Sequence, residues 1–272
     1  MTKHLFDTGY GSEPFRTLCE EYPDESVYPK QHFRIEWGPI FHRGRLDGSA
    51  RILVIGQDPA QNENIVRRIL VGEAGQRIQG FLAKLGIERS YVMVNTYLYS
   101  VYGSAPAKVR RDPRLTGYRN QWLDALLVGT NVEAVLALGL LAEEAWNAWK
   151  ATPQGQQLNL PFLRITHPTQ PESSSKGVKA KLKEATRKML LQWNAALQTL
   201  HQAVQHPDVQ RPLTLYGDAF AEGDKHSIPD FDLPSGLPVW MREKDGWARR
   251  VGTTDEAKRA NITLKVPKDY LK

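Results

Sequence analysis

The stretch ARILVIGQDPA at residues 50–60 decides the fold class of this chain. Its first seven residues form a compact apolar run rich in β-branched side chains, which is typical of a buried strand. The run ends in Gly-Gln-Asp-Pro, a composition typical of a turn. A strand that is apolar on both faces indicates a parallel sheet with helices packed on each side.

Apolar runs of the same kind recur along the chain. We expect further strands at residues 90–98, 132–139 and 161–168. Helical periodicity fills the segments at residues 62–86 (broken near Gly72 and Gly75), 112–129, 140–150 and 175–204. Strands that alternate with helices of this length imply βαβ units. We therefore predict an α/β fold of three α/β/α layers with a short central parallel sheet.

Changes in the character of the sequence suggest three segments. We expect the α/β domain to span residues 30–204, preceded by an N-terminal cap at 1–29 with little periodicity. Residues 205–272 are rich in Pro, Gly, Asp and aromatic side chains, and they predict a C-terminal extension without recognisable chemistry. Within it, ITLKVP at 262–267 reads as one more strand.

Composition limits the kinds of protein that this chain can be. A hydrophobic fraction of 41% and a charged fraction of 24% are those of an ordinary globular protein. No run approaches 18 apolar residues and the N-terminal residues lack a secretory signal, so we expect a cytoplasmic protein without a membrane span. The single cysteine, Cys19, excludes an intrachain disulfide and a cysteine-built metal site. The net charge of +6 suits a polyanionic partner such as DNA.

Polar side chains follow three of the predicted strands. Asp58 follows the first strand, Asn95 lies at the end of the second, and His167 lies at the end of the fourth. Ligands of open α/β sheets bind outside the carboxyl ends of the strands. We therefore expect an acid, an amide and an imidazole to face one pocket, although about 40 and 70 residues separate them in sequence.

The same segments carry a family resemblance. GQDPA at 56–60 resembles the first motif of the uracil-DNA glycosylase superfamily, and HPTQPESSSKG at 167–177 resembles its second. Residues 70–96 resemble the stretch between strands one and two in bacterial branches of that superfamily. The resemblance covers roughly residues 35–200 and implies a uracil-DNA glycosylase-like fold and the excision of a base from DNA.

The resemblance also implies roles that suit the chemistry of each residue. Asp58 would orient the attacking water and stabilise the cationic sugar, while His167 would donate a hydrogen bond to the departing base. Asn95 has the donor and the acceptor needed to read a pyrimidine edge, and Gln57 would offer its backbone N–H to the base.

DNA must also be held while the target base leaves the stack. The second motif supplies the expected contacts to the backbone and the expected wedge, namely Thr169, Gln170, Pro171, Ser173, Ser174 and Lys176. The alternative interpretation of this stretch is an ordinary serine-rich helix cap. The charge run at residues 108–112 is a second candidate for DNA contact, or a solvated face.

The base-binding part of the sequence departs from the best-known uracil enzymes. Ala60 replaces a tyrosine that excludes groups on C5 of the pyrimidine, and Leu70 replaces an aromatic side chain that stacks on the base. The cysteines of the iron–sulfur branches are absent. These departures leave two alternatives open, repair of uracil and antiviral defence against hypermodified cytosine such as glucosylated hydroxymethylcytosine.

Hydrolysis by an oriented water requires no metal and no organic cofactor. With no lysine nucleophile in the motifs, we expect a monofunctional glycosylase that leaves an abasic site, and we expect a monomer. An alternative of another class is a sensor that binds modified DNA without cutting it. An unrelated α/β hydrolase or nucleotide-binding enzyme lacks support, since neither a GxSxG elbow nor a GxxxxGK[ST] loop occurs.

Overall fold

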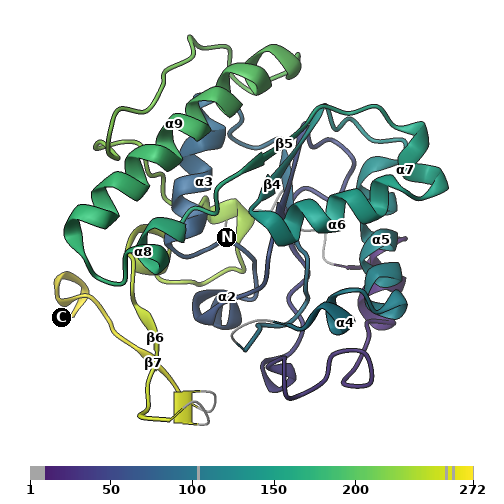
Figure 1. Ribbon diagram of the computed structural model, residues 1–272, viewed down its shortest axis with the longest axis horizontal. Coiled ribbons are helices and arrows are strands. Elements are labelled where there is room, and N and C mark those ends of the chain that lie inside the picture. Colours follow the sequence, from purple (N-terminus) through teal and green to yellow (C-terminus); the bar gives the residue numbers. More distant parts are fainter. Residues whose placement is uncertain (1–9, 103–104, 255–256, 259–260, 272) are drawn as a thin grey trace.

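The computed structural model describes residues 10–102, 105–254, 257–258 and 261–271, and it has a sheet with helices packed on both faces (Figure 1). The strands are β1 (His42–Gly44), β2 (Ile52–Gly56), β3 (Tyr91–Asn95), β4 (Ala134–Leu138), β5 (Phe162–Ile165), β6 (Ala248–Arg250) and β7 (Ile262–Leu264). The helices are α1 (Phe15–Glu20), α2 (Gln61–Val66), α3 (Glu73–Lys84), α4 (Ala107–Arg110), α5 (Pro113–Leu127), α6 (Leu140–Lys150), α7 (Pro153–Gln157), α8 (Gln170–Ser175), α9 (Lys179–Ala203) and α10 (Trp240–Glu243).

The five-stranded sheet has the order β1-β3-β2-β4-β5. Strands β2 to β5 run parallel to one another, and β1 pairs antiparallel with β3 at one edge. The predicted three-layer α/β/α fold with its short central sheet is thus confirmed, with one antiparallel strand added. Parallel strands place all their carboxyl ends at one edge, which is the edge that the candidate site requires.

Alternating side chains of β2 divide the core into two halves. Leu53 and Ile55 face the cluster that contains α5 and α6, whereas Ile52 and Val54 face the cluster that contains α3 and α9. Figure 1 shows these helix pairs on opposite sides of the sheet. Burial on both faces explains why the strand reads as a continuous apolar run, because successive side chains of a strand point to opposite faces.

Strand β1 was not predicted because its residues, His42, Arg43 and Gly44, carry no apolar pattern. Arg43 is completely buried and is paired with Asp232 of the C-terminal extension at 2.6 Å. Its guanidinium also donates to the carbonyl of Ile69 and to Gln79. A buried arginine is tolerated here because its donors and its charge are satisfied, and the partner comes from 189 residues away.

We expect Asp232→Ala to lower the free energy of unfolding by about 3 kcal/mol, because it leaves the Arg43 charge buried without its partner. Denaturant unfolding measures this change. The matched control is Asp218→Ala, which breaks the exposed pair of Asp218 with Arg187 and should leave stability unchanged. Similar effects of the two substitutions would contradict the importance assigned to the buried pair.

The helix predicted over residues 62–86 is two helices. Helix α2 ends at Val66, and α3 begins at Glu73, with Arg67 and Leu70 at positive φ between them. The predicted break near Gly72 is confirmed, because Gly72 is the N-cap of α3, whereas a break at Gly75 was wrong, because Gly75 lies inside that helix. A Cβ at Gly75 would lie 1.6 Å from the carbonyl oxygen of Leu70, so glycine permits this loop to pack on the helix.

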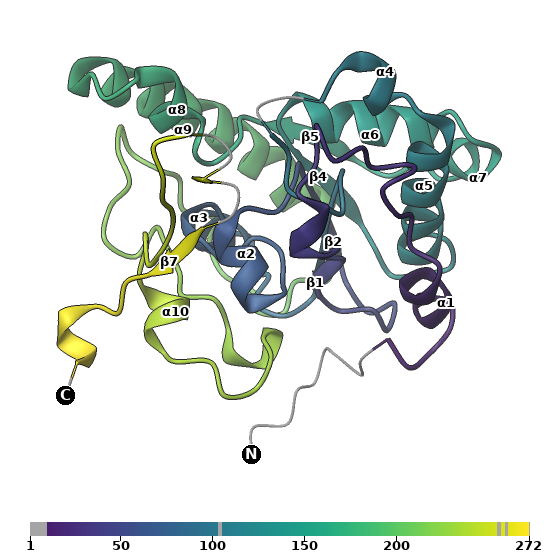
Figure 2. The same cartoon turned by 90° about the horizontal axis from the view of Figure 1, so that it is seen from below.

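The C-terminal extension packs beside α2 and α3 (Figure 2). Strands β6 and β7 form an antiparallel pair, which confirms the strand predicted in ITLKVP. Trp240 and Trp247 share a core cluster with Val66, the last residue of α2, and with Val71 of the loop that follows it. The boundary at residue 205 stays a prediction.

The N-terminal cap begins its described part at Tyr10, and residues 1–9 lie outside the described ranges. Helix α1 packs on α5, where the rings of Phe15 and Trp122 lie 5.4 Å apart. The cap therefore contributes to the core on the α5 side, and its boundary at residue 29 stays a prediction.

Candidate functional site

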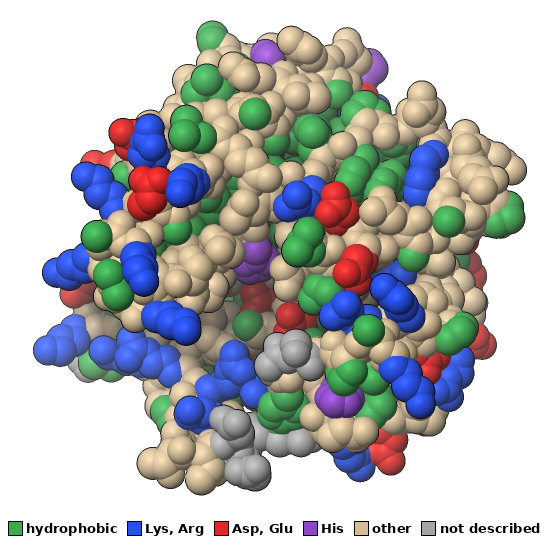
Figure 3. All heavy atoms as spheres, viewed as in Figure 1, with side chains coloured by type: hydrophobic (Ala, Val, Ile, Leu, Met, Phe, Trp, Pro, Cys, Tyr) green, Lys and Arg blue, Asp and Glu red, His purple; other side chains and the backbone are tan. Residues whose placement is uncertain are grey.

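A pocket of about 340 Å³ opens at the carboxyl ends of β2, β3 and β5. Figure 3 shows a hollow near the middle of this face, with acidic and histidine side chains inside it. The residues that line the pocket are Gln57, Asp58, Ala60, Gln61, Asn62, Glu63, Leu70, Gly72, Glu73, Ala74, Asn95, His167, Thr169, Gly246 and Arg250. The structure thus brings together every residue predicted to act on the base, together with Thr169.

Asp58 lies just beyond β2, where Pro59 follows it. Its Oδ2 accepts a hydrogen bond from the backbone N–H of Val101 at 3.0 Å. Burial, and to a smaller extent the nearby Glu63 carboxylate, raises the pKa of Asp58 to about 6, against the opposing effects of Val101 and Arg250. The group is therefore a carboxylate at neutral pH, but a more basic one than an exposed aspartate.

His167 lies just beyond β5 and faces the same pocket. Burial and the positive charge of Arg77 lower its pKa to about 4, so the imidazole is neutral at physiological pH. The backbone N–H of Thr169 points at Nδ1 from 3.4 Å, and an N–H can only donate. This contact makes Nδ1 the acceptor and leaves the ring proton on Nε2, which is available to donate to a ligand.

Asn95 ends β3 beside Gly56 of β2. A Cβ at Gly56 would lie 2.2 Å from Oδ1 of Asn95, so glycine is needed for this amide to lie against the neighbouring strand. The side chain of Gln57 donates to the carbonyl of Leu138 at 3.3 Å. Its amide is therefore engaged with β4, and the predicted contact of Gln57 with a base through its backbone N–H stays a prediction.

Glu63 organises the loop that forms one wall of the pocket. Its carboxylate accepts from the backbone N–H groups of Ala60 and Val71, each at 3.0 Å. It thereby fixes the backbone at Ala60 and next to Leu70, and both of these residues line the pocket. Sequence reasoning missed Glu63, although a glutamate at the third position of a helix is the signal of half a capping box.

Most of the predicted DNA-contact residues lie on α8, beside the pocket rather than in it. The hydroxyls of Ser173, Ser174 and Ser175 donate to carbonyls of their own helix. Gln170 is exposed whereas Pro171 is buried, so Gln170 is the better placed of the two predicted wedge residues. Lys176 is exposed just after the helix. Phosphate contact by Ser173, Ser174 and Lys176 stays a prediction.

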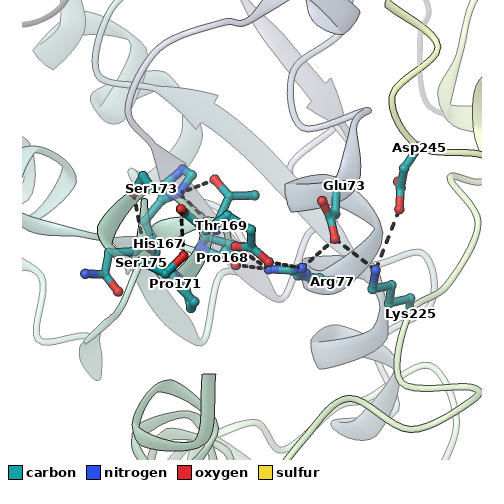
Figure 4. Close-up of polar contacts among 12 residues, drawn as sticks. Glu73, Arg77, His167, Pro168, Thr169, Pro171, Ser173, Ser175, Lys225 and Asp245 are labelled. Atoms are coloured by element: carbon teal, nitrogen blue, oxygen red, sulfur yellow. Dashed lines mark hydrogen bonds and ion pairs between the residues drawn. The ribbon is translucent and has the colours of Figure 1, made fainter. Parts of the chain in front are cut away.

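Arg77 of α3 holds the segment around His167, and sequence reasoning missed it (Figure 4). Its guanidinium donates to the carbonyl of Pro168 and to both carboxylate oxygens of Glu172, at 3.2 and 2.6 Å. Arg77 also pairs with Glu73, which in turn binds Lys225 at 2.9 Å. This chain of charges links the second motif to the C-terminal extension.

The extension also reaches the pocket itself. Gly246, just before β6, and Arg250, the last residue of β6, line its wall. The interpretation of residues 205–272 as free of recognisable chemistry was therefore incomplete, because a positive charge from this segment lies near Asp58 and opposes the rise of its pKa. No periodic pattern or motif in the extension signals this contact.

Within the described ranges, no group of three or more His, Cys, Asp or Glu side chains could hold a metal ion. Of the helices in the same part of the chain, none has the length and apolar character needed to cross a bilayer.

Comparison with known proteins gives one family match. The family model described as the uracil DNA glycosylase superfamily matches residues 43–198, which span the sheet from Arg43 of β1 through most of α9. No curated protein sequence matches the chain.

Proposed function

The chain belongs to the uracil-DNA glycosylase superfamily, and we propose that it is a DNA glycosylase that hydrolyses the N-glycosidic bond of a flipped-out pyrimidine. The observation that carries this proposal is the pairing of a carboxylate of pKa about 6, Asp58, with a neutral imidazole, His167, in one pocket. An anionic carboxylate and a neutral N–H donor suit the two ends of a bond that breaks with charge separation.

In the proposed reaction, the Asp58 carboxylate orients a water toward C1′ and stabilises the positive charge that develops on the sugar. The Nε2–H of His167 donates to the base carbonyl oxygen, where negative charge collects. A neutral donor serves here because it stabilises the leaving base without repelling the cationic sugar. Asn95 reads the pyrimidine edge through its amide, whose two ends match uracil in one orientation and cytosine in the other.

The product is an abasic site in an intact strand. The proposed mechanism uses water as the nucleophile and no lysine, so strand cleavage should appear only after alkali treatment. Incubation with DNA duplexes that contain uracil, hydroxymethylcytosine or glucosylated hydroxymethylcytosine, followed by mass identification of the released base, tests the proposal and identifies the substrate.

A second candidate substrate is hypermodified cytosine, and polar groups around Ala60 favour it. Ala60 offers only a methyl group where a bulky side chain would fill the pocket. Beyond it, Gln61 and Asn62 line the pocket, and Oε1 of Gln61 and Nδ2 of Asn62 are buried without a hydrogen-bond partner among the described residues. A buried donor and acceptor of this kind suit a polar substituent such as a hydroxymethyl group or a sugar.

We expect Ala60→Tyr to separate the two substrates. The added ring should lower excision of a C5-substituted pyrimidine by about 100-fold or more, while uracil excision changes by less than about 10-fold, because only the former needs the space beside C5. Single-turnover rates on matched duplexes measure the split. Ala60→Ser, which adds little volume, is the control. An equal loss on both substrates would show that position 60 does not control access to C5.

A further inference from the structure

A second cavity, of about 270 Å³, lies between the end of β3 and helices α4, α5 and α6. Its wall carries cationic and hydrogen-bonding side chains from these elements, namely Thr96, Arg110, Arg111, Thr116, Arg119 and Asn147. Glu144 is the acidic residue in the wall. Three arginines against one glutamate give the cavity a positive charge.

Arg119 is the least exposed of the arginines, with 7% of its surface accessible. Its Nε and Nη2 are buried and have no hydrogen-bond partner among the described residues. The groups that act on its charge are two tyrosines, Tyr28 and Tyr97, and Glu144, and burial lowers the pKa of Arg119. A buried guanidinium with unpaired donors is costly, so these donors point to a ligand that supplies acceptors.

The other two arginines are more exposed: Arg110 is partly buried, and Arg111 is exposed. Nε of Arg110 lies 3.5 Å from the Glu144 carboxylate, which holds this side chain on the cavity wall. Arg111 is exposed and follows α4 directly. Both belong to the charge run at residues 108–112, which the proposed mechanism does not use.

We propose that this cavity binds a phosphate oxyanion, with Arg119 at its base and Arg111 at its mouth. Guanidinium groups suit this ligand because their N–H donors match the oxygens of a phosphate. Thr96 of the cavity directly follows Asn95 of the base pocket, so the two cavities flank the end of β3. Figure 3 shows Lys and Arg side chains over the region of α4 and α6, beside the central hollow.

Two sources can supply this ligand, a phosphodiester of the DNA strand or free phosphate. The first source rests on the proposed function, whereas the second does not. The test therefore uses binding rather than base release, so that a protein without glycosylase activity still gives an answer.

Arg119→Gln removes the charge and retains a polar side chain, and Arg114→Gln is the matched control. Arg114 lies in the same helix, exposed and paired with Asp112, outside the cavity wall. We expect inorganic phosphate to raise the melting temperature of the wild type relative to chloride at equal ionic strength. Arg119→Gln should abolish this rise, and Arg114→Gln should keep it.

The second arm measures affinity for a short oligonucleotide across a salt series. If the ligand is a DNA phosphate, Arg119→Gln should weaken binding by about 10-fold and lower the salt slope by about one. If it is free phosphate, only the thermal response should be lost. Equal behaviour of Arg119→Gln and Arg114→Gln in both arms would overturn the proposal. Should Arg119→Gln fail to fold, the exposed Arg111→Gln answers the same question, with a partial loss expected.

Discussion

Asp58→Asn is expected to lower the rate of base release by about 10³-fold, within the range found for the loss of a general base. The asparagine keeps the size of the side chain and can still accept from the N–H of Val101, but it cannot take a proton from water. The same substitution should raise the free energy of unfolding at pH 7–8 by about 3 kcal/mol, because the rise of the pKa from 3.8 to about 6 measures the cost of the buried charge.

The pH dependence of both quantities follows from that raised pKa. The rate should fall as the pH drops through about 6, where Asp58 takes up a proton. The stability gained by Asp58→Asn should be full above pH 6 and should shrink toward pH 4, because the wild type no longer holds a buried charge there. Asp47→Asn, at an aspartate outside the pocket, is the control for general charge effects. If Asp58→Asn were less stable than the wild type at pH 8, the raised pKa of Asp58 and the cost of its buried charge would be contradicted.

His167→Phe is expected to lower the rate by about 10²- to 10³-fold, as found for the loss of one donor to a developing oxyanion. The phenyl ring retains the aromatic shape and removes the Nε2–H. His167→Asn restores a donor and should recover part of the loss. Single-turnover base release measures both variants.

The pH profile distinguishes a neutral donor from a cationic one. Since the pKa of His167 is about 4, its titration should not affect the wild-type rate near pH 6.5. The pH profiles of the wild type and of His167→Phe should therefore have the same shape in that range. Thr169→Val, which removes the hydroxyl 3.3 Å from Nδ1 and keeps the backbone N–H, should change the rate by less than about 10-fold. Loss of an ionisation near 6.5 in His167→Phe would show that the imidazolium is the active form.

The central sheet and the meeting of Asp58, Asn95 and His167 could be predicted from the sequence. Strands β2, β3 and β4 are buried on both faces and read as apolar runs, and parallel strands bring their carboxyl ends together. The prediction that these three side chains face one pocket therefore needed only the positions of the strands along the chain and the rule for parallel strand ends. The loop wall held by Glu63 was not part of that prediction.

Features that depend on contacts distant in sequence could not be predicted. Arg43 makes β1 look polar, and only its pairing with Asp232 shows that this strand is buried. Arg77 lies on α3 among polar residues that are typical of a solvent-exposed helix face, yet its side chain binds Glu172 and the carbonyl of Pro168. In both cases the arginine is visible in the sequence, but its acidic partner lies far away along the chain and cannot be identified there. Without that partner, the burial of the arginine cannot be predicted.

The C-terminal extension is the clearest example of this limit. Arg250 reaches the pocket from a segment without motif or periodicity, and the cluster around Trp247 fixes that segment against the loop between α2 and α3. A truncated protein would therefore lose part of the base pocket, not merely an appendage.

The most direct test of a hydrolytic site centred on Asp58 is the release of free base from modified DNA by the wild type and by Asp58→Asn. Duplexes with uracil, hydroxymethylcytosine or glucosylated hydroxymethylcytosine are incubated with each protein, and the released base and abasic sites are quantified by mass. We predict that the wild type releases one of these bases and leaves an intact strand with an abasic site, whereas Asp58→Asn releases about 10³-fold less. Equally low release by both proteins, with retained binding to one of the duplexes, would contradict the account and identify a sensor of modified DNA.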